Sequence, residues 1–374
     1  MLMPKNILKI FLIIFLIAEI AAFLFFFFGQ MHFNFQLLKQ EIDNDRQALL
    51  KHLAWVVKIK EAQKKNIFDP TTLTWYEATS SANWYKRDAH VGIAFNNKLW
   101  VMGGVADGPK SLAYEFHDHT SDIWSSSDGI SWTLETDKAA WGKRRAHAIT
   151  ELNGKLWLAG GWVKDDWKFH NDVWSSVDGI NWVEVASTTP WSARKGHSLV
   201  AFDNKLWLIG GVDNVGAKND VWSSTDGITW ELVTDKAPWL ARYDQTIAVF
   251  NGKMWLHGGV NPGFMGRKDI WSSVDGKEWV LEKEIADYPG RHGHCILVYH
   301  DKLFILAGWS GYAHGYNDVW YSDDGVNFTQ LFADGNNSFV GREDPVCMVY
   351  NDKIWIMGGM VTSGRRVNDV WYLE

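Results

Sequence analysis

The chain has 374 residues, a formal charge of −7 and 47% apolar residues, so it can bury a sizeable core and bulk disorder is excluded. With 44 acidic against 37 basic side chains, it lacks the positive charge of a general nucleic-acid binder, and we expect no nucleic-acid partner. Two cysteines exclude a disulfide-rich scaffold and a cysteine-rich zinc module. The 24 tryptophans and 33 glycines indicate instead a short motif copied several times.

The N-terminal segment is strongly hydrophobic. Residues 10–28 are apolar at every position except Glu19. Extended to residue 7, the segment is long enough to cross a bilayer as a helix, and no small-residue cleavage site follows it. We therefore predict an uncleaved signal anchor within residues 1–30 that contacts the membrane through residues 7–28; a cleaved signal peptide is the alternative. Lys5 and Lys9 precede the span, so the positive-inside rule predicts a single-pass protein of the cell membrane with a cytoplasmic N-terminus and the rest of the chain extracytoplasmic.

Residues 31–70 are predicted to form a helical stalk or linker. Apolar residues recur there at three- and four-residue steps, and Asp45 and His52 interrupt the apolar seam. The interruptions argue against a continuous coiled coil and leave an amphipathic spacer as the alternative. Asp69 and Pro70 end the pattern.

Six copies of one motif fill residues 71–374. A tryptophan that follows Val or Ile recurs at spacings of 48 to 51 residues, at Trp124, Trp174, Trp222, Trp271, Trp320 and Trp371. An apolar run that ends in a glycine pair precedes each copy, with Ala307-Gly308 in the fifth, and a Ser-x-Asp-Gly turn follows the first five. Each unit predicts four short strands, a to d. Strands a and b are apolar continuously rather than alternately, so both faces of the sheet are covered, as in radially stacked blades.

The glycine pair, the aromatic residue of strand c and the tryptophan of strand d resemble kelch repeats, and the Ser-x-Asp-Gly-x-x-Trp turn resembles the Asp box of sialidases. Both families are β-propellers, and a kelch blade has about fifty residues. The resemblance implies an all-β, six-bladed kelch-type propeller similar to the central domain of galactose oxidase. The sixth copy lacks strand d, and residues 73–77 have its form. We therefore expect an N-terminal outer strand, 72–78, to close the ring against residues 368–373.

Each copy has an arginine before strand a, three residues after an aromatic side chain. The six are Arg87, Arg144, Arg194, Arg242, Arg291 and Arg342. Because a feature present in every blade is more typical of packing than of a ligand site, we predict a structural role, with hydrogen bonds between blades and the guanidinium stacked on the aromatic ring. The alternative is an electropositive ring that accepts an anion.

The residue after each arginine differs between blades and is a candidate for ligand contact. The six are Asp88, Arg145, Lys195, Tyr243, His292 and Glu343, with Gln245 completing the set. In the kelch family, ligands bind the face that carries the loops before strand a and between strands b and c, so the resemblance favours this face. The ring is acidic at Glu343 and Asp88 and basic at Arg145 and Lys195, which suits a ligand that carries a carboxylate. The alternative is that six solvated side chains simply vary.

The loops between strands b and c also differ. The loop of blade one is predicted to span 17 residues, Val105 to Ser121, and includes His117 and His119. His-x-His beside one carboxylate is a weak metal pattern, so we expect no metal. Blades two and five add Trp162, Trp309 and Tyr312. Such aromatic side chains suit stacking on a sugar or anchoring a peptide, or they pack the loops against one another.

Catalytic motifs are missing from the sequence, which has no phosphate-binding glycine loop, nucleophile elbow or HExxH. Galactose oxidase chemistry needs a Tyr–Cys pair, whereas Cys295 and Cys347 lie in the strand-a runs of adjacent blades and are interpreted as core residues. We therefore expect a membrane-anchored, extracytoplasmic propeller that binds a protein or glycan ligand, without catalysis and without a cofactor. The alternative is a sugar-acting enzyme, similar to N-acetylneuraminate epimerase or to sialidases.

Overall fold

The computed structural model describes residues 68–374 apart from 108–116, 166, 262, 264, 312–313 and 336–337, together with positions 17, 46 and 50. The predicted anchor and nearly all of the predicted stalk lie outside the described residues. In the described part, no helix has both the length and the apolar character needed to span a membrane. A short 3-10 helix, η1 (Pro70–Thr72), precedes the strands, and the Asp69 carboxylate caps it by accepting a hydrogen bond from the Thr71 amide at 3.0 Å.

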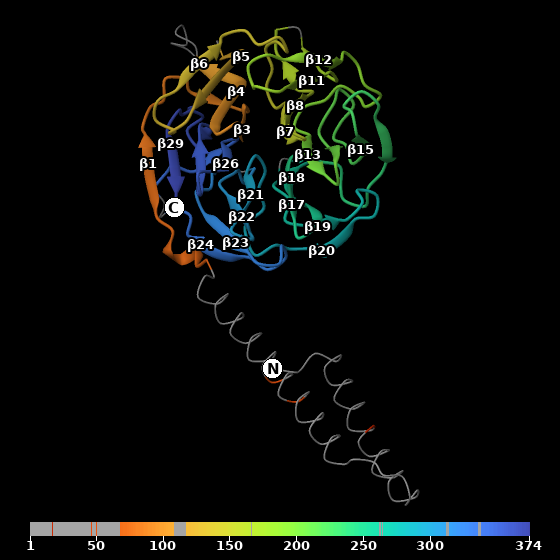
Figure 1. Cartoon of the computed structure of the whole chain (residues 1–374), viewed down its shortest axis with the longest axis vertical. Coiled ribbons are helices and arrows are strands. Elements are labelled where there is room, and N and C mark those ends of the chain that lie inside the picture. Colours follow the sequence, from red (N-terminus) through yellow and green to blue (C-terminus); the bar gives the residue numbers. More distant parts are fainter. Residues whose placement is uncertain are drawn as a thin grey trace, which may run out of the picture. The chain divides into compact units, whose positions relative to one another are not determined.

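Residues 75–374 form six antiparallel blades around a central channel, with the first strand of each blade toward the centre and the fourth at the circumference (Figure 1). Blade one is β3 (Val91–Phe95), β4 (Lys98–Asp107), β5 (His117–Ser126) and β6 (Thr133–Thr136); blade two is β7 (Ala148–Leu152), β8 (Lys155–Ala159), β11 (Val173–Ser176) and β12 (Val183–Ala186); blade three is β13 (Ser198–Phe202), β14 (Lys205–Ile209), β15 (Val221–Ser224) and β16 (Glu231–Thr234). Blade four is β17 (Tyr243–Phe250), β18 (Lys253–Val260), β19 (Ile270–Ser273) and β20 (Val280–Lys283); blade five is β21 (Cys295–Tyr299), β22 (Lys302–Leu306), β23 (Val319–Ser322) and β24 (Thr329–Phe332); blade six is β26 (Val346–Tyr350), β27 (Lys353–Met357), β29 (Val370–Leu373) and β1 (Trp75–Thr79). Two-residue strands flank the blades: β2 (Arg87–Asp88), β9 (Trp162–Val163), β10 (Lys168–Phe169), β25 (Arg342–Glu343) and β28 (Met360–Val361). The six-bladed, all-β propeller is confirmed.

The N-terminal strand closes the ring, as the sequence predicts. β1 pairs antiparallel with β29, with Trp75 opposite Leu373. The Trp75 ring is 7% exposed and meets the Phe339 ring edge-on at 4.9 Å. In blade one, Trp132 directly precedes the outer strand β6 and makes the equivalent contact with Trp84, at a distance of 5.9 Å between ring centroids. Trp75 therefore supplies the outer aromatic side chain that the sixth copy lacks.

The Asp-box turns hold neighbouring blades together. In blade two, the Asp178 carboxylate accepts hydrogen bonds from the amides of Ile180 and Asn181, each at 2.8 Å. The turn presents Gly179 to Trp100 of blade one, where an added Cβ would lie 2.9 Å from the indole. Because φ at Gly179 is also 82°, only glycine fits without strain. The repeated Ser-x-Asp-Gly sequence thus serves packing between blades.

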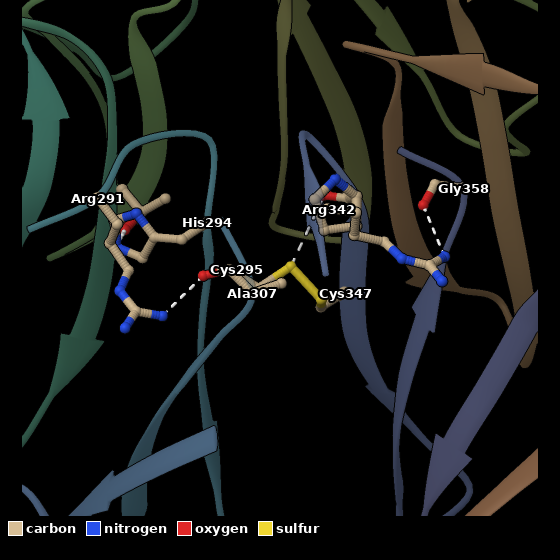
Figure 2. Close-up of a disulfide and its surroundings, with 9 residues drawn as sticks. Arg291, His294, Cys295, Ala307, Arg342, Cys347 and Gly358 are labelled. Atoms are coloured by element: carbon tan, nitrogen blue, oxygen red, sulfur yellow. Dashed lines mark hydrogen bonds between the residues drawn. A yellow bond between two sulfur atoms is a disulfide. The ribbon is translucent and has the colours of Figure 1, made fainter. Parts of the chain in front are cut away.

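A disulfide joins two neighbouring blades. Cys295 in β21 and Cys347 in β26 are bonded, with their Cα atoms 5.8 Å apart (Figure 2). The interpretation of these cysteines as separate core residues is therefore wrong. They are 52 residues apart in the chain, and only the ring brings the innermost strands of blades five and six side by side.

Candidate functional site

The six repeated arginines are buried and neutralised inside the blades. Each guanidinium donates to both carboxylate oxygens of one aspartate at 2.6–3.0 Å. The pairs are Arg87–Asp122, Arg144–Asp172, Arg194–Asp220, Arg242–Asp269, Arg291–Asp318 and Arg342–Asp369. Figure 2 shows the further bond that Arg291 donates to the Ala307 carbonyl at 2.8 Å. All of these bonds run within one blade, so the expectation of hydrogen bonds between blades is wrong.

Four of the aspartates, Asp122, Asp172, Asp220 and Asp269, have a pKa below its usual value despite their burial. Burial alone raises the pKa of Asp122, but the hydrogen bonds from Arg87 reverse the effect and hold that pKa below its usual value. The indole nitrogen of Trp124 donates to the same carboxylate at 2.7 Å. These interactions explain why Asp precedes the strand-c tryptophan in every copy, and they leave the arginines no free face for a ligand.

The second residue after each arginine lines the channel. φ lies between 48° and 61° at these six positions, which are Ala89, Ala146, Gly196, Asp244, Gly293 and Asp344. Backbone hydrogen bonds link them from blade to blade: the amide of Ala146 donates to the carbonyl of Ala89 at 2.8 Å, and the amide of Asp344 donates to the carbonyl of Gly293 at 2.9 Å. The blades therefore meet at the channel through their main chains.

A cavity of about 150 Å³ lies in the channel at this level. Its walls are the second and third residues after each arginine, together with Thr246; the third residues are His90, His147, His197, Gln245, His294 and Pro345. Burial lowers the pKa of His90 to about 3, so its imidazole is neutral at neutral pH. Both ring nitrogens of His90 and of His147 lack a hydrogen-bond partner in the described chain. The cavity is therefore polar and its walls are incompletely satisfied.

Two carboxyl groups that sequence reasoning missed, Asp244 and Asp344, line this cavity. Burial raises the pKa of Asp344 to about 7, and the carboxylates of Asp244 and Asp88 add to the rise while Arg145 opposes it. Burial also raises the pKa of Asp244. A signal for them exists in the sequence: this position is Ala or Gly in four copies and Asp in two.

Glu343 and Asp88, the acidic residues among the predicted ligand-contact residues, lie close to these two carboxyl groups. Burial raises the pKa of Glu343 to about 9, and the Asp344 carboxylate adds to the rise. The Glu343 carboxylate lies 3.4 Å from Nδ1 of His292. Asp88 instead accepts a hydrogen bond at 2.6 Å from Arg366, a buried residue that sequence reasoning missed. Of the seven predicted residues, only Gln245 lines the cavity itself.

Arg145 and Lys195, the basic residues among the predicted ligand-contact residues, form no ion pair with any described residue. Nε of Arg145 has no hydrogen-bond partner in the described chain. Nζ of Lys195 lies 5.0 Å from the centroid of the Trp162 ring, and burial, with the neighbouring Arg145 charge, lowers the pKa of Lys195. Tyr243 is partly buried, and burial raises its pKa. The cations come from blades two and three, whereas the acidic residues come from blades one, four and six.

Trp162 is the centre of an aromatic cluster in the loops between strands b and c. Its ring centroid lies 5.4 Å from that of His119, 5.5 Å from that of Trp167 and 6.3 Å from that of Phe169. His119 accepts a hydrogen bond at Nδ1 from the Lys164 amide at 2.8 Å, and burial lowers its pKa to about 4. His119 therefore ties blade one to blade two, while Trp167 is 74% exposed.

The insertion of blade one differs from the predicted 17-residue loop. β4 and β5 continue beyond the glycine pair, and Val105 pairs with His119. Only residues 108–116, between these strands, lie outside the description. The side chain of His117 and the whole of Tyr312 are also outside it. Trp309, in blade five, pairs through its backbone with His292.

Comparison with known proteins identifies the repeat. A family model described as the KLHDC2/KLHL20/DRC7 Kelch-repeats domain matches residues 133–308, from the outer strand of blade one to Gly308 of blade five. The domain is a kelch-repeat propeller. No curated protein matches the sequence.

This kelch propeller carries two different chemistries at the channel. Arg145 and Lys195, which pair with no carboxylate of the described residues, lie beside the aromatic surface of Trp162, whereas the cavity is lined by carboxyl groups and neutral imidazoles. Among the described residues, no three His, Cys, Asp or Glu side chains are arranged to hold a metal ion.

Proposed function

We propose that this kelch propeller is a membrane-anchored binding module that holds a carboxylate-bearing protein segment at the channel mouth, outside the cytoplasm and without catalysis. One observation carries the proposal. Among the described residues, Arg145 and Lys195 have no carboxylate partner, although every repeated arginine and Arg366 has one.

The surroundings of these two cations support a protein ligand. Trp167, 74% exposed, extends the aromatic cluster beside Lys195 into solvent. Arginine and tryptophan are the residues that dominate the binding energy of protein interfaces. A planar guanidinium can bind a carboxylate through two parallel hydrogen bonds. The segment we expect therefore carries an acidic side chain close to an apolar or aromatic one.

The first prediction concerns Arg145 and Lys195. Peptides selected from a random display library on the wild-type protein are expected to be enriched in Asp or Glu, and Arg145→Ala and Lys195→Ala are each expected to weaken their binding by about 1–3 kcal/mol. The measurement is fluorescence anisotropy with the selected peptides. Arg144→Ala is the matched control, because it removes the neighbouring buried arginine and is expected to lower the melting temperature instead. Selection without acidic residues, or the reverse pattern for positions 144 and 145, would overturn the proposal.

A second function, that of a sugar-acting enzyme, is favoured by one observation. Glu343 has a pKa raised by burial to about 9 and is therefore protonated at neutral pH, as a general acid must be. A glycan array on the full chain, followed by NMR of any bound sugar, distinguishes the two functions. An anomeric change that Glu343→Gln abolishes would establish catalysis.

The anchor and the extracytoplasmic location are part of the proposal. The apolar segment 7–28 after Lys5 and Lys9 supports an outward orientation of the propeller. The Cys295–Cys347 disulfide supports it independently, because disulfides persist in oxidising compartments and are rare in the cytosol.

The second prediction tests this topology. Protease added to intact cells is expected to remove the propeller and leave the anchor. A thiol-alkylating probe applied to denatured but unreduced protein is expected to label neither cysteine. Reduction before alkylation is the control and should expose both. Protection of the propeller in intact cells, with digestion only after lysis, would place the domain in the cytoplasm.

A further inference from the structure

Trp167 occupies a turn position that its own backbone disfavours. The turn joins β9 to β10, and the amide of Trp167 donates to the carbonyl of Lys164 at 3.1 Å. φ at Trp167 is 53°, in the left-handed region, where such a turn favours glycine and a bulky side chain is an outlier. In the corresponding turn of blade six, Gly364 has a φ of 76° and donates to the Val361 carbonyl at 2.8 Å. Local backbone preference therefore does not explain a tryptophan here.

Packing does not explain Trp167 either. Its side chain is 74% exposed, and among the described residues its indole has one ring contact, with Trp162 at 5.5 Å. The tryptophans that fill the blade cores, such as Trp141 and Trp191, are instead 2% and 1% exposed. Backbone strain of this kind persists mainly at sites that bind a ligand or carry out chemistry. An exposed indole in a strained turn is therefore a candidate for direct ligand contact.

The exposed indole lies close to one of the two cations of the channel mouth. The ring centroid of Trp162 is 5.5 Å from that of Trp167 and 5.0 Å from Nζ of Lys195. Trp167 and the Lys195 ammonium are therefore no more than about 10 Å apart, a length that about three residues of extended chain cover. A single short segment can contact both. The Arg145 backbone pairs with that of Trp162, so the second cation belongs to the same surface.

We propose that Trp167 selects the protein ligand by packing against an aromatic side chain at most three positions from the acidic residue that Arg145 and Lys195 bind. The inference rests on the proposed binding function and names the second feature of the ligand. Aromatic side chains bury a large area with few rotatable bonds, and pairs of aromatic rings gain energy beyond the area that they bury. Because the turn holds the indole in place before the ligand arrives, little freedom is lost on binding.

The third prediction uses the full-length protein and the acidic peptides selected on it. These peptides are expected to carry Trp, Tyr or Phe within three positions of the Asp or Glu. Trp167→Asn should weaken their binding at least tenfold in the anisotropy assay. Its melting temperature should be unchanged or higher, because asparagine tolerates the left-handed conformation. Val215→Ala is the matched control, since Val215 is 90% exposed in the corresponding loop of blade three and should leave binding unchanged.

A double-mutant cycle tests the contact itself. Replacing the aromatic residue of a selected peptide by alanine should weaken its binding to the wild-type protein at least tenfold, but its binding to Trp167→Asn less than threefold. Equal losses with both proteins, acidic peptides without an aromatic residue, or a lower melting temperature of Trp167→Asn would overturn the proposal. Binding of a glycan that Trp167→Asn abolishes would also overturn it, because the indole would then stack on a sugar.

Failure of the underlying peptide-binding function gives a different result. If Arg145→Ala and Lys195→Ala weaken binding but Trp167→Asn does not, only the role of Trp167 is overturned. If no acidic peptide is selected, or if the variants at positions 145 and 195 bind as the wild-type protein does, the binding function fails and the role of Trp167 falls with it.

Discussion

Trp75→Ala is expected to lower the free energy of unfolding by about 3–5 kcal/mol, the usual cost of truncating a large buried aromatic side chain. Trp75 is 7% exposed and packs against Phe339 and Phe332, at centroid distances of 4.9 and 6.4 Å. The cost should be high because this side chain fills the gap between the N-terminal strand and the core of blade six. Denaturant unfolding followed by fluorescence and circular dichroism provides the measurement.

Tyr76→Ala is the matched control. Tyr76 is the next residue in β1 but is 43% exposed, and it stacks on Tyr372 at 5.3 Å. Its truncation is expected to cost about 1 kcal/mol or less. Equal effects at positions 75 and 76 would mean that β1 is not what closes the ring.

Truncation tests the same closure without a point mutation. Removal of residues 1–66 retains β1, which pairs with β29 from Trp75 to Thr79, and should leave a folded, soluble domain. Removal through residue 80 deletes the strand and exposes the edge of β29, which invites aggregation. An unchanged melting temperature after the longer truncation would contradict closure by this strand.

The fold could be predicted because its information is repeated. Five glycine pairs, the Ala307-Gly308 pair and six strand-c tryptophans define the blades several times over, and the missing outer strand of the sixth copy indicates how the ring closes. Likewise, Gly358, at the first position of a pair, has no room for a Cβ because the imidazole of His90 in the next blade lies against it. Ala307 replaces the first glycine of the pair in blade five. In the next blade the position of His90 is taken by Pro345, so no imidazole is present there. Internal copies thus carry pairing information even without homologous sequences.

The cavity could not be predicted in the same way. It exists because six segments about fifty residues apart converge on one axis, and the sequence does not show which of three consecutive positions faces that axis. The position after each arginine varies most, which predicts ligand contact there, but its backbone pairs with the loop between strands b and c, as Arg145 does with Trp162. The next two positions line the channel instead. Arg366 escaped notice for a related reason, since its loop has no repeated counterpart.

The largest effect of a single charge change is expected at the buried pair of Arg291 and Asp318. Their side chains are 0% and 1% exposed, and the carboxylate also accepts a hydrogen bond from the indole nitrogen of Trp320 at 2.7 Å. Asp318→Asn keeps the shape of the side chain but leaves the Arg291 guanidinium buried without a counter-charge. Removing one partner of a buried pair costs about 3–5 kcal/mol.

Asp323→Asn, five residues along the same blade, is the control for Asp318→Asn. Asp323 pairs with Lys302, but its side chain is 72% exposed, and solvent screening limits such a pair to about 0–1 kcal/mol. If the six repeated arginines serve packing, the double variant Arg291→Met/Asp318→Leu should lose less stability than the sum of the losses of its two single variants. The reason is that no charge then remains buried without a partner. Additive losses in the double variant, or similar losses at positions 318 and 323, would show that solvent reaches the pair, and the arginines would then be available to an anionic ligand after all.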